Sequence, residues 1–330
     1  MNPKNQSSFD TLIIGAGLAG LCAANSLSNG SRNIAIIDKG RGAGGRLAAR
    51  RIGEAVFDHG AQFFTARSKL FKACVDDWIA AGVAEQWYQS YPGQPNGHAR
   101  YRGVPTMSAI AKHLAKQQSN IQSTRVERLS HTNTDWTLHL DNGETLSAKS
   151  VIATCPVPQT LTLLADSNIE LCLPMINRLE TIQYESCIAV MAVLDSPTTL
   201  ESPGALALDK GPIAWISDNY KKGVSPVPAI TIHASGDYSA KYFNQDRLTI
   251  GRELIELARP LFGNAKVVDF QVHGWLYSKP TVTDNDTSLL ISEGLDMPPL
   301  ALAGDAFAGP RFEGAVVSGW SAAKKLKSLI

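Results

Sequence analysis

The sequence lacks closely spaced cysteines that could form a disulfide or a metal site. Its 330 residues include five cysteines, which are widely spaced, and no CxxC pair occurs among them. Cys and His residues with the spacing of a zinc site are absent too, so we expect no metal site and no disulfide framework. An odd number of scattered cysteines indicates free thiols in a reducing compartment, and it argues against a disulfide-reductase flavoenzyme.

An excess of charge of one sign is also lacking. The chain has 31 Lys and Arg residues against 30 Asp and Glu residues, which gives a formal net charge of +1. A near-neutral balance creates no general attraction to nucleic acid or to an anionic membrane. No basic stripe with interleaved aromatic residues is seen either, so we expect no nucleic-acid partner.

Long hydrophobic runs are missing. The apolar run from Leu12 to Ala24 is too short to span a bilayer and is interrupted by glycines. The polar residues before it lack the features of a signal peptide. We therefore expect a cytoplasmic, soluble protein with no membrane partner, and the sequence indicates no particular oligomeric state.

The composition that remains is that of an ordinary globular protein. Hydrophobic residues make up 44% of the chain and charged residues 18%, which are typical values. A length of 330 residues exceeds the usual range of a single domain, so two closely joined domains are expected.

A glycine motif follows the first predicted strand, Leu12–Ile14. It reads Gly15-x-Gly17-x-x-Gly20 and opens a segment with helical spacing, Leu18–Leu27. Gly15 permits a tight turn, Gly17 lets phosphate oxygens approach the backbone, and Gly20 lets helix and strand pack closely. The helix N-terminus adds N–H donors and a partial positive charge, so the segment predicts a pyrophosphate site. The alternative is a glycine-rich packing turn.

An acidic residue and a second glycine segment come next. Asn29-Gly30 ends the helix, Asn33–Ile37 predicts a second strand, and Asp38 stands at its tip, where a carboxylate would bind the adenosine ribose. In Gly44-Gly45-Arg46, two glycines let the main chain bend around a cofactor and a guanidinium can clamp a phosphate. A plain nicotinamide-binding domain does not need this second segment, so the predicted dinucleotide is FAD. A solvated acid and a basic surface loop are the alternatives.

The C-terminal tail supplies further cofactor candidates. Leu300–Ala303 predicts a strand, and Asp305 in the following Gly304-Asp305 turn can accept hydrogen bonds from a ribityl hydroxyl. Gly314-Ala315 opens a predicted helix that runs to Leu329, and its N-terminus would stabilise negative charge at the O2/N1 side of the flavin. A turn followed by a surface helix is the alternative.

Further elements are predicted between these segments. Helices are expected over Leu70–Ala81, with Phe71, Cys74, Val75 and Trp78 inward, over Pro105–Lys116, with Pro105 in the first turn, and over Asp246–Phe262; Pro92–Gly97 is a loop. Three antiparallel strands are expected over 121–129, 136–140 and 145–147, with a hairpin turn at 141–143, and a strand of the parallel sheet over 150–154. More strands are expected over 186–194, 213–216, 229–233 and 267–275.

This order of elements predicts an α/β protein with a discontinuous first domain. Strand, glycine turn, helix and strand form the βαβ unit of a doubly wound sheet, and the tail returns to that unit. We predict that residues 8–70, 100–160 and 291–330 form an FAD-binding domain. Residues 71–99 and 161–290 form a substrate-binding α+β domain inserted into it.

Taken together, these motifs resemble those of the amine-oxidase-like FAD flavoproteins, and within them the bacterial renalases. The dinucleotide motifs are shared by many flavoproteins, whereas Gly60-Ala61-Gln62-Phe63, Trp275-Leu276-Tyr277 and Glu313-Gly314-Ala315 are narrower. Other matching segments are Gly15–Leu21, Asp38-Lys39, Gly44–Arg46, Asp58–His59, Arg102–Met107, Ala153–Pro158, Ile232–Ala234 and Ala303–Asp305.

The resemblance implies a fold and a set of cofactor contacts. The fold is a glutathione-reductase-type Rossmann FAD-binding domain with an inserted α+β substrate domain, in a p-hydroxybenzoate-hydroxylase-like topology, with FAD bound non-covalently. Backbone contacts around Ala19, a phosphate contact for Arg46 and flavin-adjacent positions for Gln62 and Phe63 are implied as well. The predicted cofactor residues are Gly15, Gly17, Leu18, Ala19, Gly20, Asp38, Lys39, Gly45, Arg46, Gln62, Phe63, Val126, Gly304, Asp305, Gly314 and Ala315.

The resemblance also implies an activity. Such proteins oxidise the 2- and 6-dihydro isomers of NAD(P)H to NAD(P)+ by hydride transfer to flavin N5, and O2 then takes the electrons to give hydrogen peroxide. This hydride transfer needs orientation more than acid–base help, because no proton must leave first. Aromatic walls would stack the nicotinamide, a histidine would bind its carboxamide and an arginine a phosphate. The predicted substrate residues are His233, Trp215, Trp275, Tyr277, Phe64 and Arg102.

Other interpretations stay open at this point. The aromatic residues can be plain core, His233 a satisfied core histidine and Arg102 a surface arginine. The chain can instead be a flavin amine oxidase acting on a small amine, or a non-catalytic FAD-binding protein. Lys279 is placed like the lysine that holds a water near flavin N5 in some amine oxidases, but its neighbour Pro280 favours a loop. The sequence does not distinguish NAD from NADP forms.

Overall fold

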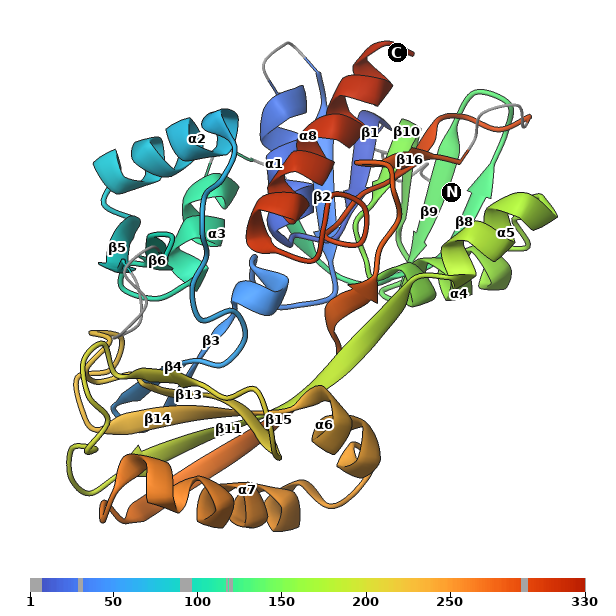
Figure 1. Cartoon of the computed structure of the whole chain (residues 1–330). Helices are drawn as coiled ribbons and strands as arrows, with labels where there is room; N and C mark the ends of the chain where they lie inside the picture. Colours follow the sequence, from blue (N-terminus) through green and yellow to red (C-terminus); the bar gives the residue numbers. More distant parts are fainter. Residues whose placement is uncertain are drawn as a thin grey trace. The chain divides into compact units, whose positions relative to one another are not determined.

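The computed structural model describes residues 8–28, 32–89, 97–116, 118, 121–291 and 296–329 (Figure 1). Its helices are α1 (Leu18–Leu27), α2 (Lys69–Ala80), α3 (Ser108–Ala115), α4 (Val157–Asp166), α5 (Leu173–Glu180), α6 (Gly236–Tyr242), α7 (Arg247–Phe262) and α8 (Phe312–Lys327), with a 3-10 turn, η1 (Gly45–Leu47). Its strands are β1 (Ser8–Ile14), β2 (Ile34–Asp38), β3 (Ala49–Ile52), β4 (Ala55–Asp58), β5 (Ala84–Tyr88), β6 (Arg100–Gly103), β7 (Ile121–Ser123), β8 (Val126–His131), β9 (Trp136–Leu140), β10 (Thr145–Ala153), β11 (Gln183–Leu194), β12 (Ala205–Ala207), β13 (Ile213–Asp218), β14 (Ala229–Ala234), β15 (Val267–Val282), β16 (Leu289–Leu290) and β17 (Leu300–Leu302). The predicted helix end Asn29-Gly30 and residues 92–96 of the predicted loop lie outside the described residues.

The chain divides into two compact units, and each is described by itself. The first unit comprises Met1–Gly45, Ala111–Gln183 and Pro280–Ile330, and the second comprises Arg46–Ile110 and Tyr184–Lys279. Both units are therefore discontinuous in sequence. The predicted ranges of the FAD-binding and substrate-binding domains stay a prediction.

A mixed sheet forms the centre of the first unit. Its strands lie in the order β16-β17-β10-β1-β2-β7, and β9 and β8 extend it from β10. Strand β1 pairs in parallel with both neighbours, Leu12 lying opposite Ala35 on one side and Val151 on the other. Parallel strands covered on both faces are near-continuous apolar runs, and Leu12, Ile13 and Ile36 are fully buried. The predicted βαβ unit is confirmed.

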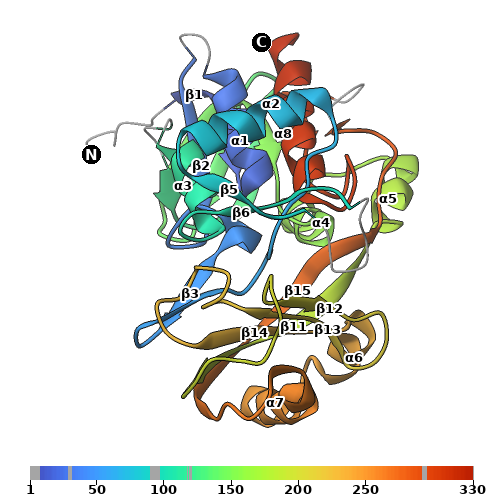
Figure 2. The same cartoon turned by 60° about the vertical axis from the view of Figure 1, so that its left-hand side comes forward.

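Helices α1 and α8 lie side by side in the first unit, although they come from opposite ends of the chain (Figures 1 and 2). A Cβ atom on Gly319 of α8 would lie 2.2 Å from the carbonyl oxygen of Ala19 in α1. Only glycine permits so close an approach of two helix backbones. The C-terminal tail therefore belongs to the same unit as the glycine motif.

Two strand predictions were wrong in their extent. The predicted strand 121–129 is two strands, because β7 pairs in parallel with β2 whereas β8 pairs antiparallel with β9. The predicted strands 145–147 and 150–154 are one strand, β10, whose first residues also pair with β9. The burial of β10 alternates at its start and is continuous at its end. The two halves therefore resemble an antiparallel and a parallel strand.

Three other local predictions also need correction. Helix α3 begins at Ser108, and Pro105 precedes it, because Gly103–Thr106 form a turn so tight that a Cβ atom on Gly103 would lie 2.2 Å from the Thr106 oxygen. Lys279 lies in β15 rather than in a loop. In α2, Phe71, Val75 and Trp78 are buried as predicted, but Cys74 is only half-buried. None of the five cysteines forms a disulfide.

The second unit is built on an antiparallel sheet with the strand order β12-β13-β14-β11-β15. Successive side chains of a strand point to opposite faces. In β11, Val190 packs in the core that contains Leu254 of α7, whereas Met191 packs against Phe57 of β4. Helix α7 therefore covers one face of the sheet and the β3–β4 hairpin the other (Figure 1).

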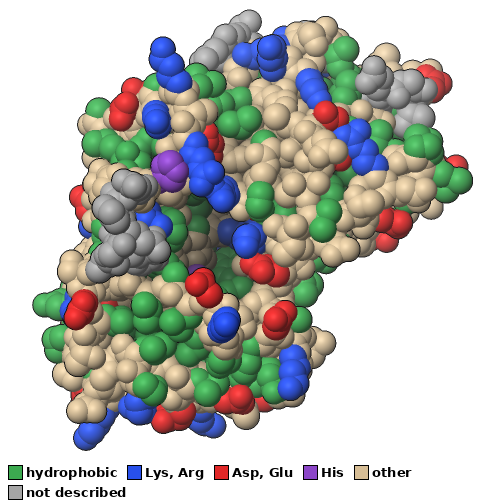
Figure 3. Space-filling view, in the orientation of Figure 1, with side chains coloured by type: hydrophobic (Ala, Val, Ile, Leu, Met, Phe, Trp, Pro, Cys, Tyr) green, Lys and Arg blue, Asp and Glu red, His purple; other side chains and the backbone are tan. Residues whose placement is uncertain are grey.

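Charged side chains of both signs lie on the face of the molecule shown in Figure 3. They are interspersed there, in keeping with a net charge of +1. Within the described part of the chain, no helix combines the length and the apolarity needed to cross a membrane.

Candidate functional site

The glycine turn between β1 and α1 has the backbone that its sequence predicts. Gly15 has φ +110°, and a Cβ atom there would lie 2.5 Å from Thr154 Oγ1. A Cβ atom on Gly20 would lie 1.9 Å from the Gly15 carbonyl oxygen. These two glycines are therefore required by packing, with or without a ligand.

Gly17 differs from its neighbours because no atom lies within 4 Å of the position its Cβ would occupy. It is the N-cap of α1, with no side-chain cap, so the first N–H groups of the helix have no partner within the helix. Open space beside unsatisfied N–H donors at a helix N-terminus fits a pyrophosphate.

Asp38 ties the end of β2 to the glycine turn. Its Oδ2 accepts a hydrogen bond of 2.7 Å from the Ala16 N–H, and its Oδ1 accepts one of 2.6 Å from the Gly40 N–H. A carboxylate has about four acceptor positions, so two bonds leave capacity for ribose hydroxyls. The neighbouring Lys39 is exposed.

The second glycine segment lies directly against the first. The Gly44 N–H donates to the Ala16 carbonyl at 2.8 Å, and a Cβ atom on Gly45 would lie 3.6 Å from Gly17 Cα. Gly45 has φ +53° and Gly44 φ +135°, both in the region that favours glycine. The two segments that predict FAD are therefore one structure at the carboxyl ends of β1 and β2.

The C-terminal candidates lie after β17, which pairs in parallel with β10. Gly304 has φ +151° with open space around its Cβ position, and its N–H donates to Ser318 Oγ at 2.9 Å. Helix α8 begins at Phe312 rather than at Gly314. A Cβ atom on Gly314 would lie 2.0 Å from the Gly309 oxygen, so packing of the first turn requires this glycine. Asp305 and Ala315 are half-buried.

The other predicted cofactor residues of the first unit are packed in its core. Leu18 and Ala19 are buried in α1. Val126 begins β8, opposite Leu140, and is also buried. Such residues can reach a cofactor through their backbone atoms, and their contacts with FAD stay a prediction.

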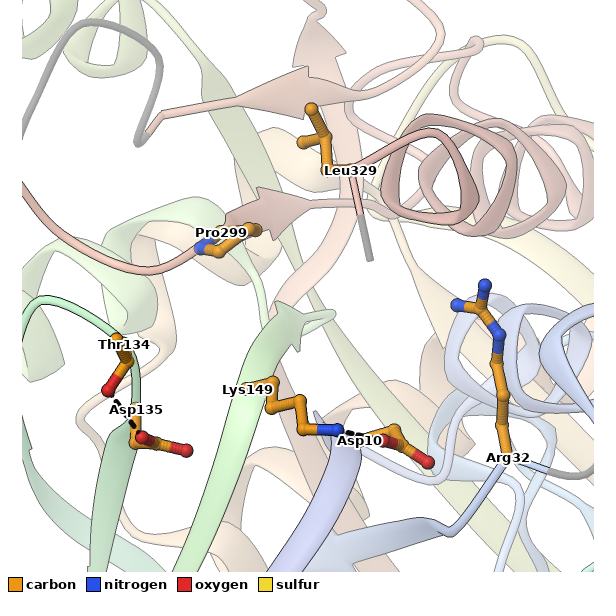
Figure 4. A pocket seen from close by; sticks show the side chains of 7 residues that line it. All are labelled: Asp10, Arg32, Thr134, Asp135, Lys149, Pro299 and Leu329. Carbon is orange, nitrogen blue, oxygen red and sulfur yellow. Dashed lines mark hydrogen bonds and ion pairs between the residues drawn. The ribbon is translucent and has the colours of Figure 1, made fainter.

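A shallow pocket of about 510 Å³ lies elsewhere in the first unit (Figure 4). Asp10, Arg32, Lys149 and Pro299 line it near the amino ends of the parallel strands, together with Thr134, Asp135 and Leu329. Lys149 donates to Asp10 at 2.9 Å. Ligands of open parallel sheets bind at the carboxyl ends of the strands, so this pocket is not the cofactor site.

In the second unit, a buried ion pair stands at the end of β4. Lys222 Nζ lies 2.8 Å from Asp58 Oδ2, and both side chains are 0% exposed. Burial lowers the pKa of Lys222, and the charge of Asp58 opposes that change. Asn219 Oδ1 accepts from the Asp58 N–H at 3.3 Å.

Gln62 is held within the same network. Its Nε2 donates to the carbonyls of Asp58 at 2.7 Å and Gly60 at 3.1 Å, and its Oε1 accepts from Ser217 Oγ at 2.8 Å. The side chain therefore orders its own loop. Phe63 is half-buried, with its ring 5.4 Å from the ring of Trp215.

Histidines and a tryptophan gather around the same loop. The His59 carbonyl accepts from His233 Nε2 at 3.1 Å and from Trp275 Nε1 at 2.9 Å. The His59 ring stacks on Trp275 at 5.2 Å and meets His273 edge-on. Burial lowers the pKa of His59 to about 3 and that of His233 to about 4. Both rings are therefore neutral at neutral pH, and the predicted role of His233 toward the substrate stays a prediction.

The other predicted substrate residues have diverse surroundings. Trp215 is buried beside Phe63, and Tyr277 meets Tyr184 edge-on at 5.5 Å. Phe64 is 2% exposed and packs among Phe71, Trp78 and Tyr101. This packing agrees with the alternative interpretation of Phe64 as a core residue.

Two arginines of the second unit are held by protein groups. Arg102 is buried rather than at the surface, with its guanidinium 2.7 Å from Glu85. Arg46 donates to the Ser278 carbonyl at 3.0 Å. The predicted phosphate contacts of both residues stay predictions.

Sequence reasoning missed Asp58 and Lys222 as partners. Asp58 belongs to a segment quoted for the resemblance, but Lys222 follows Lys221 in a glycine-containing turn that is typical of a surface. A lysine's burial depends on distant residues, so no local signal was available. Within the described ranges, no group of His, Cys, Asp and Glu residues is arranged to hold a metal ion.

Comparison with known proteins gives the family. Residues 13–78 match the NAD(P)-binding Rossmann-like domain, and residues 86–327 match the flavin containing amine oxidoreductases. Renalase of Mus musculus is 24% identical over 339 residues, which cover 97% of this chain and 99% of that protein. Cyclohexylamine oxidase from Brevibacterium oxydans IH-35A has a similar fold, with a TM-score of 0.75 at 12% identity over 97% of this chain and 99% of that chain. Putrescine oxidase bound to putrescine also has a similar fold, with a TM-score of 0.68 at 13% identity over 97% of this chain and 99% of that chain.

These matches agree with the glycine turn, the acid at the end of β2 and the returning C-terminal helix. They extend over nearly the whole chain, so the likeness is not confined to a nucleotide-binding motif. The chain belongs to the flavin containing amine oxidoreductases, and it is a renalase-like, FAD-dependent oxidoreductase with a Rossmann-like FAD-binding domain.

Proposed function

We propose that this protein is an oxidase of the renalase type, which oxidises the 2- and 6-dihydro isomers of NAD(P)H to NAD(P)+. The observation that carries the proposal is the similarity to a renalase along 97% of the chain. The oxidase family implies a small-molecule substrate and O2. When bound, FAD supplies a hydride acceptor at N5 and passes the electrons to O2, which gives hydrogen peroxide.

For the cofactor, we propose a non-covalent site with the topology of glutathione reductase and p-hydroxybenzoate hydroxylase. Gly17 and the N-terminus of α1 would receive the pyrophosphate, and Asp38 the ribose. Arg46, Gln62 and Phe63 are further proposed FAD contacts. The open space at Gly17 and the remaining acceptor positions of Asp38 support this assignment.

For the substrate, the second unit supplies aromatic faces and neutral hydrogen-bonding groups. Trp275, stacked on His59, and Trp215, beside Phe63, are proposed to orient a pyridine ring. Oxidation of a dihydropyridine requires no prior loss of a proton, so orientation by neutral groups suffices. His233 is proposed to bind the carboxamide of the substrate, and its pKa of about 4 keeps its ring neutral at neutral pH.

A flavin amine oxidase is the second candidate. The family match and the fold of cyclohexylamine oxidase favour it, but one fold hosts many reactions.

Anaerobic reduction of the purified holoprotein distinguishes the two candidate functions. We expect 6-dihydro-NAD and 2-dihydro-NAD to bleach the flavin absorption rapidly, and small amines to leave it unchanged. Bleaching by amines alone would establish the amine oxidase instead. A flavin spectrum that no donor changes would contradict both candidates.

A further inference from the structure

The buried pair of Asp58 and Lys222 lies at the start of the segment Asp58–Phe63. With both side chains 0% exposed, each charge has lost its hydration. Such burial is costly, and a buried pair is weak evidence for stability. We therefore ask which part of the chain the pair of Asp58 and Lys222 holds in place.

Lys222 joins the two ends of this segment. Its ammonium donates to Asp58 Oδ2 at 2.8 Å and to the Gln62 carbonyl at 2.6 Å. It also lies 4.9 Å from the centre of the Trp87 ring, within range of a cation–π contact. The Lys222 side chain thus connects Asp58 with Gln62, which is four positions further along the chain.

Further contacts hold this segment at Asp58 and at Gly60. Asp58 Oδ1 accepts from the Met107 N–H at 2.9 Å, and the Asp58 carbonyl accepts from Thr231 Oγ1 at 3.0 Å. A Cβ atom on Gly60 would lie 2.0 Å from the Arg46 oxygen. With these groups of Asp58 engaged and the glycine in close contact, the start of the segment is restricted to one conformation.

We propose that Lys222 is a positioning residue for the flavin: by joining Asp58 to Gln62, it sets the place of Phe63. The inference rests on the proposed function, which places Gln62 and Phe63 beside FAD. Lys222 is wholly buried within the second unit, so it acts through the segment. Misplacement of an orienting group by about 1 Å costs on the order of 100-fold in rate.

The test compares Lys222→Met with Leu254→Ala, both as FAD-loaded full-length protein. Leu254 is also 0% exposed but lies in the core on the α7 face of the sheet, away from the segment. Both variants are expected to lower Tm. Only Lys222→Met is expected to shift the visible bands of bound FAD, and to slow anaerobic flavin reduction roughly 10- to 100-fold with little change in substrate affinity.

Removing one charge leaves the other buried alone, so Lys222→Met can fail to fold. The double variant Asp58→Asn/Lys222→Met removes both charges and keeps an acceptor for the Met107 N–H. It is expected to fold and to show the same spectral shift. A wild-type spectrum and rate in either folded variant would overturn the proposal, and so would failure of both variants to fold, because the pair would then be purely structural.

Failure of the proposed function would look different. In that case neither dihydro isomer would bleach the wild-type protein. The band positions of bound FAD in Lys222→Met and Leu254→Ala would still decide the role of Lys222, because they require no substrate.

Discussion

The carboxylate of Asp38 and the backbone N–H of Ala16 are joined by a hydrogen bond of 2.7 Å. The acid that is predicted to bind ribose therefore also orders the glycine turn. Asp38→Ala should weaken FAD binding by about 1.5–3 kcal/mol, the range for hydrogen bonds to a charged group. Titration of apoprotein with FAD measures this loss. Asp166→Ala, at an exposed position of α4, serves as the control and should bind FAD normally.

Gly17 and Gly20 should respond differently to the same substitution. Gly20→Ala places a methyl group 1.9 Å from the Gly15 oxygen, so the apoprotein itself should lose stability or fail to fold. Gly17→Ala meets no protein atom within 4 Å, and its apoprotein should stay within about 1 kcal/mol of wild type. FAD binding should nevertheless fall, because the methyl group occupies the space assigned to phosphate. Denaturant unfolding and FAD titration separate the two effects, and normal FAD binding by Gly17→Ala would contradict the site.

Arg46→Ala should reduce FAD retention. If the guanidinium clamps the pyrophosphate, the loss is about 1–3 kcal/mol, and it should appear as lower flavin content after dialysis. Arg51→Ala removes an exposed arginine of β3 and is the matched control. Equal flavin content in the two variants would reject the phosphate contact.

Acidification should destabilise the second unit. The folded-state pKa values of His59, about 3, and His233, about 4, lie below the value near 6.5 of an unfolded chain. Protons therefore bind the unfolded state first. The contribution of these two histidines to the free energy of unfolding is fully present above about pH 6.5. It is lost as the pH falls toward 4, by about 1.4 kcal/mol per pH unit for each histidine.

Thermal unfolding between pH 7 and 5 measures this loss. His233→Gln keeps a donor for the His59 carbonyl. It should reduce the change in the free energy of unfolding per pH unit by the contribution of one histidine, relative to the wild-type protein. An equal pH dependence in the variant and the wild-type protein would show that His233 does not contribute.

Local patterns predicted the nucleotide-binding half well. Helix α1 has the predicted bounds, because its glycines and apolar residues act over a few positions. The errors in strand bounds occurred where pairing with a distant strand decides the extent of a strand. Thr145–Ala153 is one strand because β9 and β1 both pair with it. Residues 121–129 divide because β2 takes the first part and β9 the second.

The same reasoning applies to the site. Gly15, Gly17 and Asp38 are adjacent through short loops, so their spacing carried the information. Lys222 pairs with Asp58 across 164 positions. No spacing rule connects a lysine in one turn with an acid at the end of a distant strand. His233 and Arg102 were recognised as candidates, but whether they were buried depended on the second unit as a whole.

The contact of Gly319 with Ala19 has a consequence for biosynthesis. Helix α1 emerges from the ribosome before α8, the helix that covers it, and 284 residues lie between Leu27 and Phe312. At about 5–20 residues per second, the nascent chain carries this uncovered apolar surface for roughly a quarter of a minute to a minute. Throughout that interval, α1 is a natural ligand for chaperones that capture exposed hydrophobic segments.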